Sequence, residues 1–237
     1  MCGIAGVIGK EDEPRVRRMI AQVKHRGPDN TGILVRDGVS LAHARLSVID
    51  TSTNANQPML SDDEGTVVVF NGEIYNFSEL RLELENDGVI FSTASDTEVI
   101  LALYKKKGES CFSSFAGMFA IALYDFSNKT LLLARDRMGE KPLYWTEDRG
   151  DILFGSELSA LLVSGMHHKE VSLPALVTYL QLDYVPTPNS IIKNVHKVAP
   201  GTVVTFKDQH LLTTKTFWSP PRTIKTMSIT SAVNKLD

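Results

Sequence analysis

The sequence has few cysteines: only Cys2 and Cys111 occur in 237 residues. Two cysteines so far apart do not make the disulfide framework of a small secreted domain. No apolar run is long enough to cross a bilayer, and the first residues lack the basic and long apolar segments of a signal peptide. We therefore expect a protein of the reducing cytoplasm, where an exposed thiol survives, with no membrane partner.

The chain also lacks a strong excess of charge of either sign. Its formal net charge is −3 and no basic stripe stands out, so the sequence gives no electrostatic reason to expect nucleic-acid binding. No carboxylate or cysteine stands at a metal-ligand spacing from His25 or His43. We therefore expect no metal site, and two structural histidines with satisfied hydrogen bonds. The length fits one large domain, or one domain with a tail.

The chemistry that is present begins at Cys2. A small residue in second position favours removal of Met1, which would leave the thiol and a free α-amine on the same carbon. The thiolate is the nucleophilic form of cysteine, and an adjacent base supplies it. An α-amine, with a reference pKa of about 7.7–8.0, accepts a proton near neutral pH. A cysteine before an apolar strand is also compatible with simple burial, so this position alone leaves both interpretations open.

The hydrophobic pattern predicts hairpins alternating with helices. Residues 4–8 form a predicted buried strand that would fix the N-terminus, and residues 66–70 form a strand that stops at Asn71-Gly72-Glu73. Residues 76–79 and 95–98 fit the capping-box pattern at a helix start. The other predicted strands are 32–35, 39–42, 118–124, 131–134, 143–145, 153–155 and 202–206, and helices are predicted from Pro14, Asn76 and Ser95 and at 157–164 and 173–182.

Several predicted strands are apolar on both faces, although their hairpins make them antiparallel. A sheet with one wet face would alternate instead. Two antiparallel sheets packed together, each with helices on its outer side, explain the pattern. We therefore expect an α+β fold, a four-layer αββα sandwich. Residues 2–218 would form this domain, and residues 219–237, which turn polar and contain Pro220-Pro221, would be a linker or the start of a missing domain.

Seven short motifs follow one another along residues 2–218. Together they resemble the glutaminase domain of class II glutamine amidotransferases, which are N-terminal nucleophile hydrolases, and the proline after His-Arg-Gly is most similar to asparagine synthetase. The motifs are Cys2-Gly3-Ile4-Ala5-Gly6, His25-Arg26-Gly27-Pro28-Asp29, His43-Ala44-Arg45-Leu46-Ser47, Asn71-Gly72-Glu73-Ile74-Tyr75-Asn76, Ser95-Asp96-Thr97-Glu98, Ala134-Arg135-Asp136-Arg137 and Lys141-Pro142-Leu143-Tyr144.

The resemblance implies an N-terminal nucleophile hydrolase fold and hydrolysis of L-glutamine to glutamate and ammonia. In that family's scheme, Cys2 attacks the side-chain amide and forms a thioester, while the Asn71 side chain and the Gly72 N–H stabilise the oxyanion. Arg45 would bind the substrate α-carboxylate and Asp96 the α-ammonium. The resemblance completes the pocket with Leu46, Val48, Ile49, Asn71, Gly72 and Glu73.

Simpler interpretations of the same residues remain open from the sequence. Asp96 also suits the first turn of a helix, where a carboxylate stabilises the helix dipole. Arg45 alone is compatible with a surface ion pair, and Asn71-Gly72 alone with a turn. The non-enzymatic alternative is therefore a catalytically silent module that binds glutamine or serves as a scaffold.

The resemblance also predicts what the chain needs beyond itself. A Ser-Gly-Gly-x-Asp-Ser loop that binds ATP pyrophosphate is typical of the synthetase module, and it does not occur here. We expect no cofactor in this domain, with ATP and Mg²⁺ confined to a missing synthetase domain that acts in cis or in trans. The acceptor could instead be a sugar, a peptide or an envelope precursor. A homodimer is compatible with the resemblance.

Overall fold

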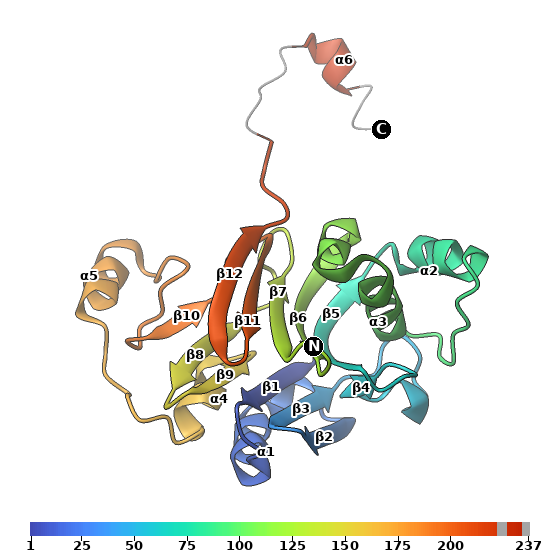
Figure 1. Cartoon of the computed structure of the whole chain (residues 1–237). Helices are drawn as coiled ribbons and strands as arrows, with labels where there is room; N and C mark the ends of the chain where they lie inside the picture. Colours follow the sequence, from blue (N-terminus) through green and yellow to red (C-terminus); the bar gives the residue numbers. More distant parts are fainter. Residues whose placement is uncertain (222–226, 234–237) are drawn as a thin grey trace.

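Two antiparallel sheets of six strands face each other in the computed structural model, which describes residues 1–221 and 227–233 (Figure 1). The first sheet has the order β10-β8-β9-β1-β3-β2 and the second has the order β12-β11-β7-β6-β5-β4. The first contains β1 (Gly3–Ile8), β2 (Asn30–Arg36), β3 (Val39–Arg45), β8 (Tyr144–Asp148), β9 (Asp151–Gly155) and β10 (Val195–Lys197). The second contains β4 (Met59–Leu60), β5 (Thr66–Ile74), β6 (Gly117–Asp125), β7 (Thr130–Arg135), β11 (Thr202–Lys207) and β12 (His210–Thr216).

Helices cover the outer face of each sheet. Helices α1 (Glu13–Gln22) and α4 (Leu158–Val163) pack on the first sheet, and α2 (Phe77–Asn86) and α3 (Asp96–Lys107) pack on the second (Figure 1). The remaining helices are α5 (Leu173–Leu182), α6 (Ile229–Val233) and 3₁₀ segments at Lys24–Arg26, Thr53–Ala55 and Gly108–Ser114. The predicted four-layer αββα sandwich is confirmed.

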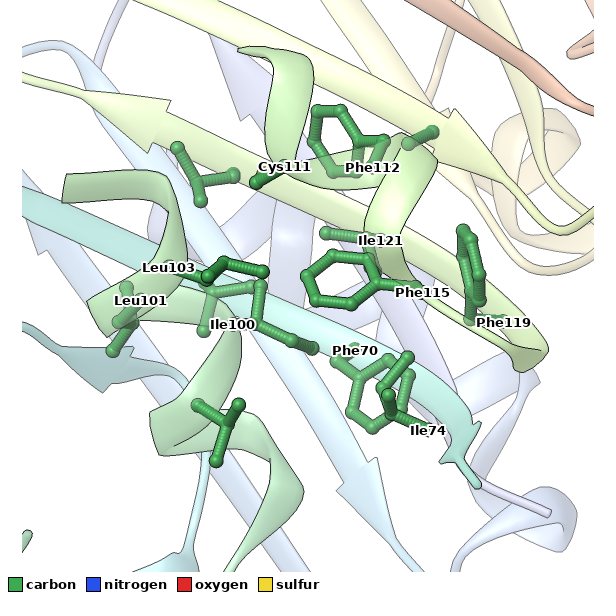
Figure 2. Close-up of a cluster of buried hydrophobic side chains, with 14 of the residues drawn as sticks. Phe70, Ile74, Ile100, Leu101, Leu103, Cys111, Phe112, Phe115, Phe119 and Ile121 are labelled. Atoms are coloured by element: carbon green, nitrogen blue, oxygen red, sulfur yellow. The ribbon is translucent and has the colours of Figure 1, made fainter. Parts of the chain in front are cut away.

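Three buried clusters correspond to the three spaces between these four layers. The cluster between the sheets joins side chains such as Ile4 and Leu41 of the first sheet to Val69 and Leu133 of the second. The cluster between the second sheet and its helices packs four phenylalanines, Phe70, Phe112, Phe115 and Phe119, among aliphatic side chains and contains Cys111, as Figure 2 shows. Burial of this kind stabilises a fold by roughly 25 cal/mol per Å² of apolar surface. Cys111 is fully buried there, in the manner of a small hydrophobic residue.

The first strand lies inside its sheet and not at an edge. β1 pairs with β3 on one side and with β9 on the other, both antiparallel. The Ile4 N–H donates to Ser156 Oγ at 2.9 Å, which ties the start of the strand to the segment after β9. An N-terminus held on both sides does not fray, so the residue that precedes β1 has a fixed position.

Four strands differ from the prediction. β5 does not stop at Asn71 but continues to Ile74, because β6 pairs with it along its whole length. β4, β10 and β12 were missed, since two are very short and β12 is polar and largely exposed.

Neither capping box forms. The Asn76 amide bonds Ser114 and Ala116 instead of its own helix, and Glu98 accepts from the N–H groups of Ser92 and Thr93.

None of the helices in the described part of the chain has the length and apolar character needed to cross a membrane. The predicted linker at 219–237 lies partly outside the described residues, and the domain boundary stays a prediction.

Candidate active site

One cavity of about 110 Å³ opens at the end of the space between the two sheets. Met1 and Cys2, just before β1, line it together with residues from β3, β5, the start of α3 and the loop after β3. The structure brings together all the residues that the sequence predicted for the site: Cys2, Arg45, Leu46, Val48, Ile49, Asn71, Gly72, Glu73 and Asp96. Segments from Cys2 to Lys141, far apart in the chain, therefore converge on one pocket.

The Cys2 thiol sits against the backbone of Leu46. The Leu46 N–H lies 3.4 Å from Sγ, and Sγ lies 3.6 Å from the Leu46 carbonyl oxygen. Burial raises the pKa of the Cys2 thiol, while the Leu46 N–H and the nearby N-terminal ammonium oppose that rise. The resting thiol is therefore protonated at neutral pH, and a nucleophilic role requires a base beside it.

The His-Arg-Gly-Pro-Asp motif holds both Cys2 and the neighbouring loop. Arg26 Nε donates to the Cys2 carbonyl at 3.0 Å, and its Nη1 lies 2.9 Å from Glu157 Oε1. A β-carbon at Gly27 would lie 2.1 Å from the Ala44 carbonyl oxygen, so only glycine permits this close approach to β3. Asp29 accepts from the Ser47 N–H at 2.8 Å. The motif thus positions the nucleophile without lining the cavity.

Asn71 is fully buried, and neither its amide nitrogen nor its amide oxygen has a hydrogen-bond partner among the described residues. Such unpartnered amides are rare in protein interiors because each unmade bond costs about 1–3 kcal/mol. Gly72 follows with φ +155°, and a β-carbon there would lie 2.0 Å from the Met118 carbonyl oxygen on β6. Glycine is required at position 72 because any side chain would collide with the neighbouring strand β6.

Arg45 is buried, and three partners hold one side of its guanidinium. Nη1 donates to the Ser52 carbonyl at 2.7 Å and to Asn56 Oδ1 at 2.6 Å, and Nη2 donates to the Asp50 carbonyl. The hydrogen bonds of the described residues leave Nε–H and the second Nη2–H unused. These two form the edge with which a guanidinium binds a carboxylate in bidentate fashion.

Asp96 provides the opposite charge on the cavity wall. Its Oδ2 accepts from the Ile74 N–H at 3.1 Å. Burial raises the pKa of the Asp96 carboxyl to about 6, and repulsion from Glu73 adds to the rise. A cationic group bound beside this carboxylate would be stabilised, because it would relieve the burial of an unpaired charge.

The sequence missed several residues of the cavity wall. His43, Gln57, Ser95, Thr97, Met118 and Lys141 also line it. The expectation of a satisfied structural histidine was wrong for His43: Nε2 lies 3.1 Å from the Phe70 carbonyl, but Nδ1 is buried without a partner in the described structure. The sequence did indicate that His43 faces the cavity: it lies two residues before Arg45 on one strand, and alternate residues of a strand share a face.

Comparison with known proteins gives consistent matches. A family model described as a glutamine amidotransferase domain matches residues 1–218. The glutamine-hydrolyzing asparagine synthetase 1 of Bacillus subtilis is 38% identical over 225 residues, which cover 92% of this chain and 35% of that protein. Asparagine synthetase B of Escherichia coli is 42% identical over 168 residues, which cover 68% of this chain and 30% of that protein. The chain thus spans about a third of the length of these relatives.

Among solved structures, the glutamine phosphoribosylpyrophosphate amidotransferase from B. subtilis is similar with a TM-score of 0.71 and 21% sequence identity. The match covers 92% of this chain and 50% of that chain. At this identity the likeness concerns the fold. It agrees with the two facing antiparallel sheets described above.

Proposed function

This chain belongs to the family of glutamine amidotransferase domains, and on that basis we propose that Cys2 carries out the hydrolysis of the glutamine side-chain amide. The observation that carries the assignment is the convergence of Cys2, an unpartnered Asn71 amide, the open edge of Arg45 and Asp96 on one cavity. Each group matches one part of glutamine: the amide carbon, its oxygen, the α-carboxylate and the α-ammonium.

The first half of the reaction forms a thioester. After removal of Met1, the α-amine of Cys2 takes the thiol proton, and Sγ attacks the side-chain carbonyl carbon of glutamine. The high pKa of the buried thiol makes this base necessary. The C–N bond then breaks, and the proton on the amine passes to the leaving nitrogen, which departs as ammonia.

The charge that develops on the carbonyl oxygen needs donors in place beforehand. The Asn71 amide nitrogen and the Gly72 N–H supply them on the strand that faces Cys2 across the cavity. Because Asn71 has no other partner among the described residues, its donors are free to meet the oxyanion without breaking an existing bond. Water then hydrolyses the thioester, and glutamate leaves.

The ammonia would pass to a synthetase module encoded in cis or in trans. The relatives are about three times as long as the part of them that this chain matches, and they are named as asparagine synthetases. We propose no cofactor in this domain, with ATP and Mg²⁺ required only by that module, and a cytoplasmic setting that keeps the thiol reduced. Joined to the module, the protein should convert aspartate, glutamine and ATP to asparagine, as amino-acid analysis would show.

The proposed reaction is tested on two forms of the same chain. Protein with Cys2 at its terminus, verified by intact mass, should release ammonia and glutamate from glutamine in equal amounts. Protein that retains Met1 should be inactive, because its α-amine is acylated by the methionine. If the verified Cys2-terminal form releases no ammonia, the chain is a silent glutamine-binding or scaffold module instead.

Replacement of Arg45 should weaken glutamine binding more than turnover. Arg45→Ala removes a charged bidentate contact, worth about 1.5–3 kcal/mol, so KM should rise roughly 10- to 100-fold with a smaller change in kcat. Steady-state kinetics measure both values. The matched control is Asn56→Ala, which removes one anchor of the same guanidinium at 2.6 Å and leaves the carboxylate-binding edge intact. An unchanged KM in Arg45→Ala would remove Arg45 from the pocket.

Glutamine affinity should fall in acid because of Asp96. With a pKa of about 6 in the free protein, the Asp96 carboxyl is protonated below that pH and no longer attracts the α-ammonium. In a Cys2→Ala background, which binds but does not react, the Kd should rise about tenfold per pH unit below 6. Isothermal titration calorimetry from pH 4.5 to 8 measures this.

Its control is Asp96→Asn in the same background. That variant should bind glutamine weakly at every pH, with no break near 6. A break that persists in Asp96→Asn would assign the titration to another group, such as Glu73.

A further inference from the structure

Three polar atoms of the cavity wall are buried without a partner among the described residues: His43 Nδ1 and the amide nitrogen and oxygen of Asn71. Both residues line the same cavity as Cys2. A buried polar atom without a partner costs free energy, so two such residues in one cavity indicate that something with hydrogen-bonding capacity occupies the space between them in use. The proposed mechanism uses Asn71 but leaves His43 without a role.

Strand alternation places these side chains on facing surfaces. Leu41 points into the space between the sheets, so His43, two residues further along β3, points the same way. By the same rule Asn71 follows Val69 on β5, and Cys2 precedes Ile4 on β1. His43 also pairs directly with Ile4 in the antiparallel register of β1 and β3. All three side chains therefore enter the end of the inter-sheet space, His43 from β3, Asn71 from β5 and Cys2 from the position just before β1.

The contact with Phe70 determines what His43 offers. A carbonyl oxygen only accepts, so Nε2 must carry the hydrogen that it donates to Phe70 at 3.1 Å. In a neutral imidazole, Nδ1 is then an acceptor. Burial, with a smaller contribution from the Arg45 guanidinium, lowers the pKa of His43 to about 4, so the ring stays neutral at working pH.

We infer that His43 Nδ1 accepts a hydrogen bond from the group that leaves or attacks the acyl carbon, first the amide nitrogen of glutamine and then the hydrolytic water. This inference rests on the proposed glutaminase reaction and assigns a further residue to it. A primary amide carries two N–H donors, and a glutamate carboxylate carries none, so an acceptor at this place also favours substrate over product.

The two groups share one position for a chemical reason. Ammonia leaves the tetrahedral carbon along the direction from which water later attacks the thioester, since both steps exchange the same bond position opposite sulfur. In the second step the water oxygen bonds to the acyl carbon and one water proton goes to the Cys2 amine. The C–S bond breaks with its electron pair on sulfur, which recovers the proton. His43 holds the other O–H without taking its proton.

Two variants separate the acceptor from the anchor. In His43→Gln the longer side chain can keep a donor to the Phe70 carbonyl but places no acceptor at Nδ1. In His43→Asn the amide ends near the Nδ1 position and can present an oxygen there. We expect kcat for ammonia release to fall about 10- to 100-fold in His43→Gln and to be partly recovered in His43→Asn.

Labelling of Cys2 by an electrophilic glutamine analogue is the matched readout, because alkylation needs the thiolate and the glutamine subsite but no leaving amide. Its rate should be unchanged in His43→Gln. Equal losses of labelling and turnover, or wild-type kcat in His43→Gln, would overturn the inference. Absence of ammonia from the unaltered protein would instead refute the underlying glutaminase proposal.

A measurement without any change at His43 provides a second test. In the Cys2→Ala form, the ¹⁵N resonance of His43 Nδ1 should move upfield when glutamine binds and stay in place when glutamate binds, because only the amide donates a hydrogen bond to it. A resonance that glutamine does not move would overturn the inference even if both His43 variants failed to fold.

Discussion

Cys2→Ala should lose glutaminase activity by a factor on the order of 10⁴ or more, since removal of a catalytic nucleophile leaves only binding and oxyanion stabilisation. The variant should still bind glutamine, because Arg45 and Asp96 lie on other elements of the cavity wall. Ammonia release and calorimetric binding of glutamine measure the two properties on one preparation.

Cys111→Ala is the matched control for this loss. Cys111 is fully buried in the cluster between the second sheet and its helices, and burial raises the pKa of its thiol to about 12. It should therefore react with nothing, and its replacement should leave turnover unchanged. An electrophilic glutamine analogue should add to Cys2 alone, as peptide mass mapping would show. Substantial activity in Cys2→Ala, or an adduct on Cys111, would contradict the assignment of the nucleophile.

Asn71→Ala should lower kcat by about 10²–10³, equivalent to about 2.7–4 kcal/mol of lost oxyanion stabilisation. The effect on binding should be small, because the carbonyl oxygen carries little charge before Sγ attacks. Kinetics of ammonia release and the Kd of glutamine in the Cys2→Ala background separate these two effects.

The thermal stability of the same variant distinguishes catalysis from structure. The Asn71 side chain makes no hydrogen bond with any described residue, so its truncation breaks none and removes two buried unpartnered atoms. Asn71→Ala should therefore melt at the same temperature as the parent or above it. Asn76→Ala provides the contrast, because its amide bonds Ser114 and Ala116 at 3.0 and 2.9 Å and should be needed for stability. A parallel fall of Tm and kcat in Asn71→Ala would mean that Asn71 is structural.

The layers of the fold could be predicted from the sequence because they depend on local patterns. Strands such as Thr66–Phe70 are apolar on both faces, and an antiparallel strand has this character only when it is covered on both sides. The predicted strands 32–35 and 39–42 do form a hairpin, which turns through Asp37-Gly38, a pair that favours a tight turn. The site residues were gathered by the resemblance of short motifs, and the structure brings them to one cavity.

The features that could not be predicted from the sequence depend on contacts between residues far apart in the chain. Asn71-Gly72 has the composition of a turn, but pairing with Ala120 and Phe119 on β6 keeps it extended. The role of Arg26 depends on the Cys2 carbonyl and Glu157, which are far from it in the chain. The free acceptor of His43 depends on the Phe70 carbonyl in the opposite sheet. No local spacing reports such contacts.

The interior position of β1 has a consequence for maturation. Met1 lines the cavity, and Gly3, two residues on, is already paired with Ala44 of β3. Met1 itself is exposed, but the sheet restrains the chain from Gly3 onwards, so an aminopeptidase should reach the Met1–Cys2 bond more readily before the sheet forms. We therefore expect Met1 to be removed faster from the nascent chain than from the folded protein. An affinity tag should therefore be placed at the C-terminus, because a tag at the N-terminus would keep the Cys2 α-amine acylated.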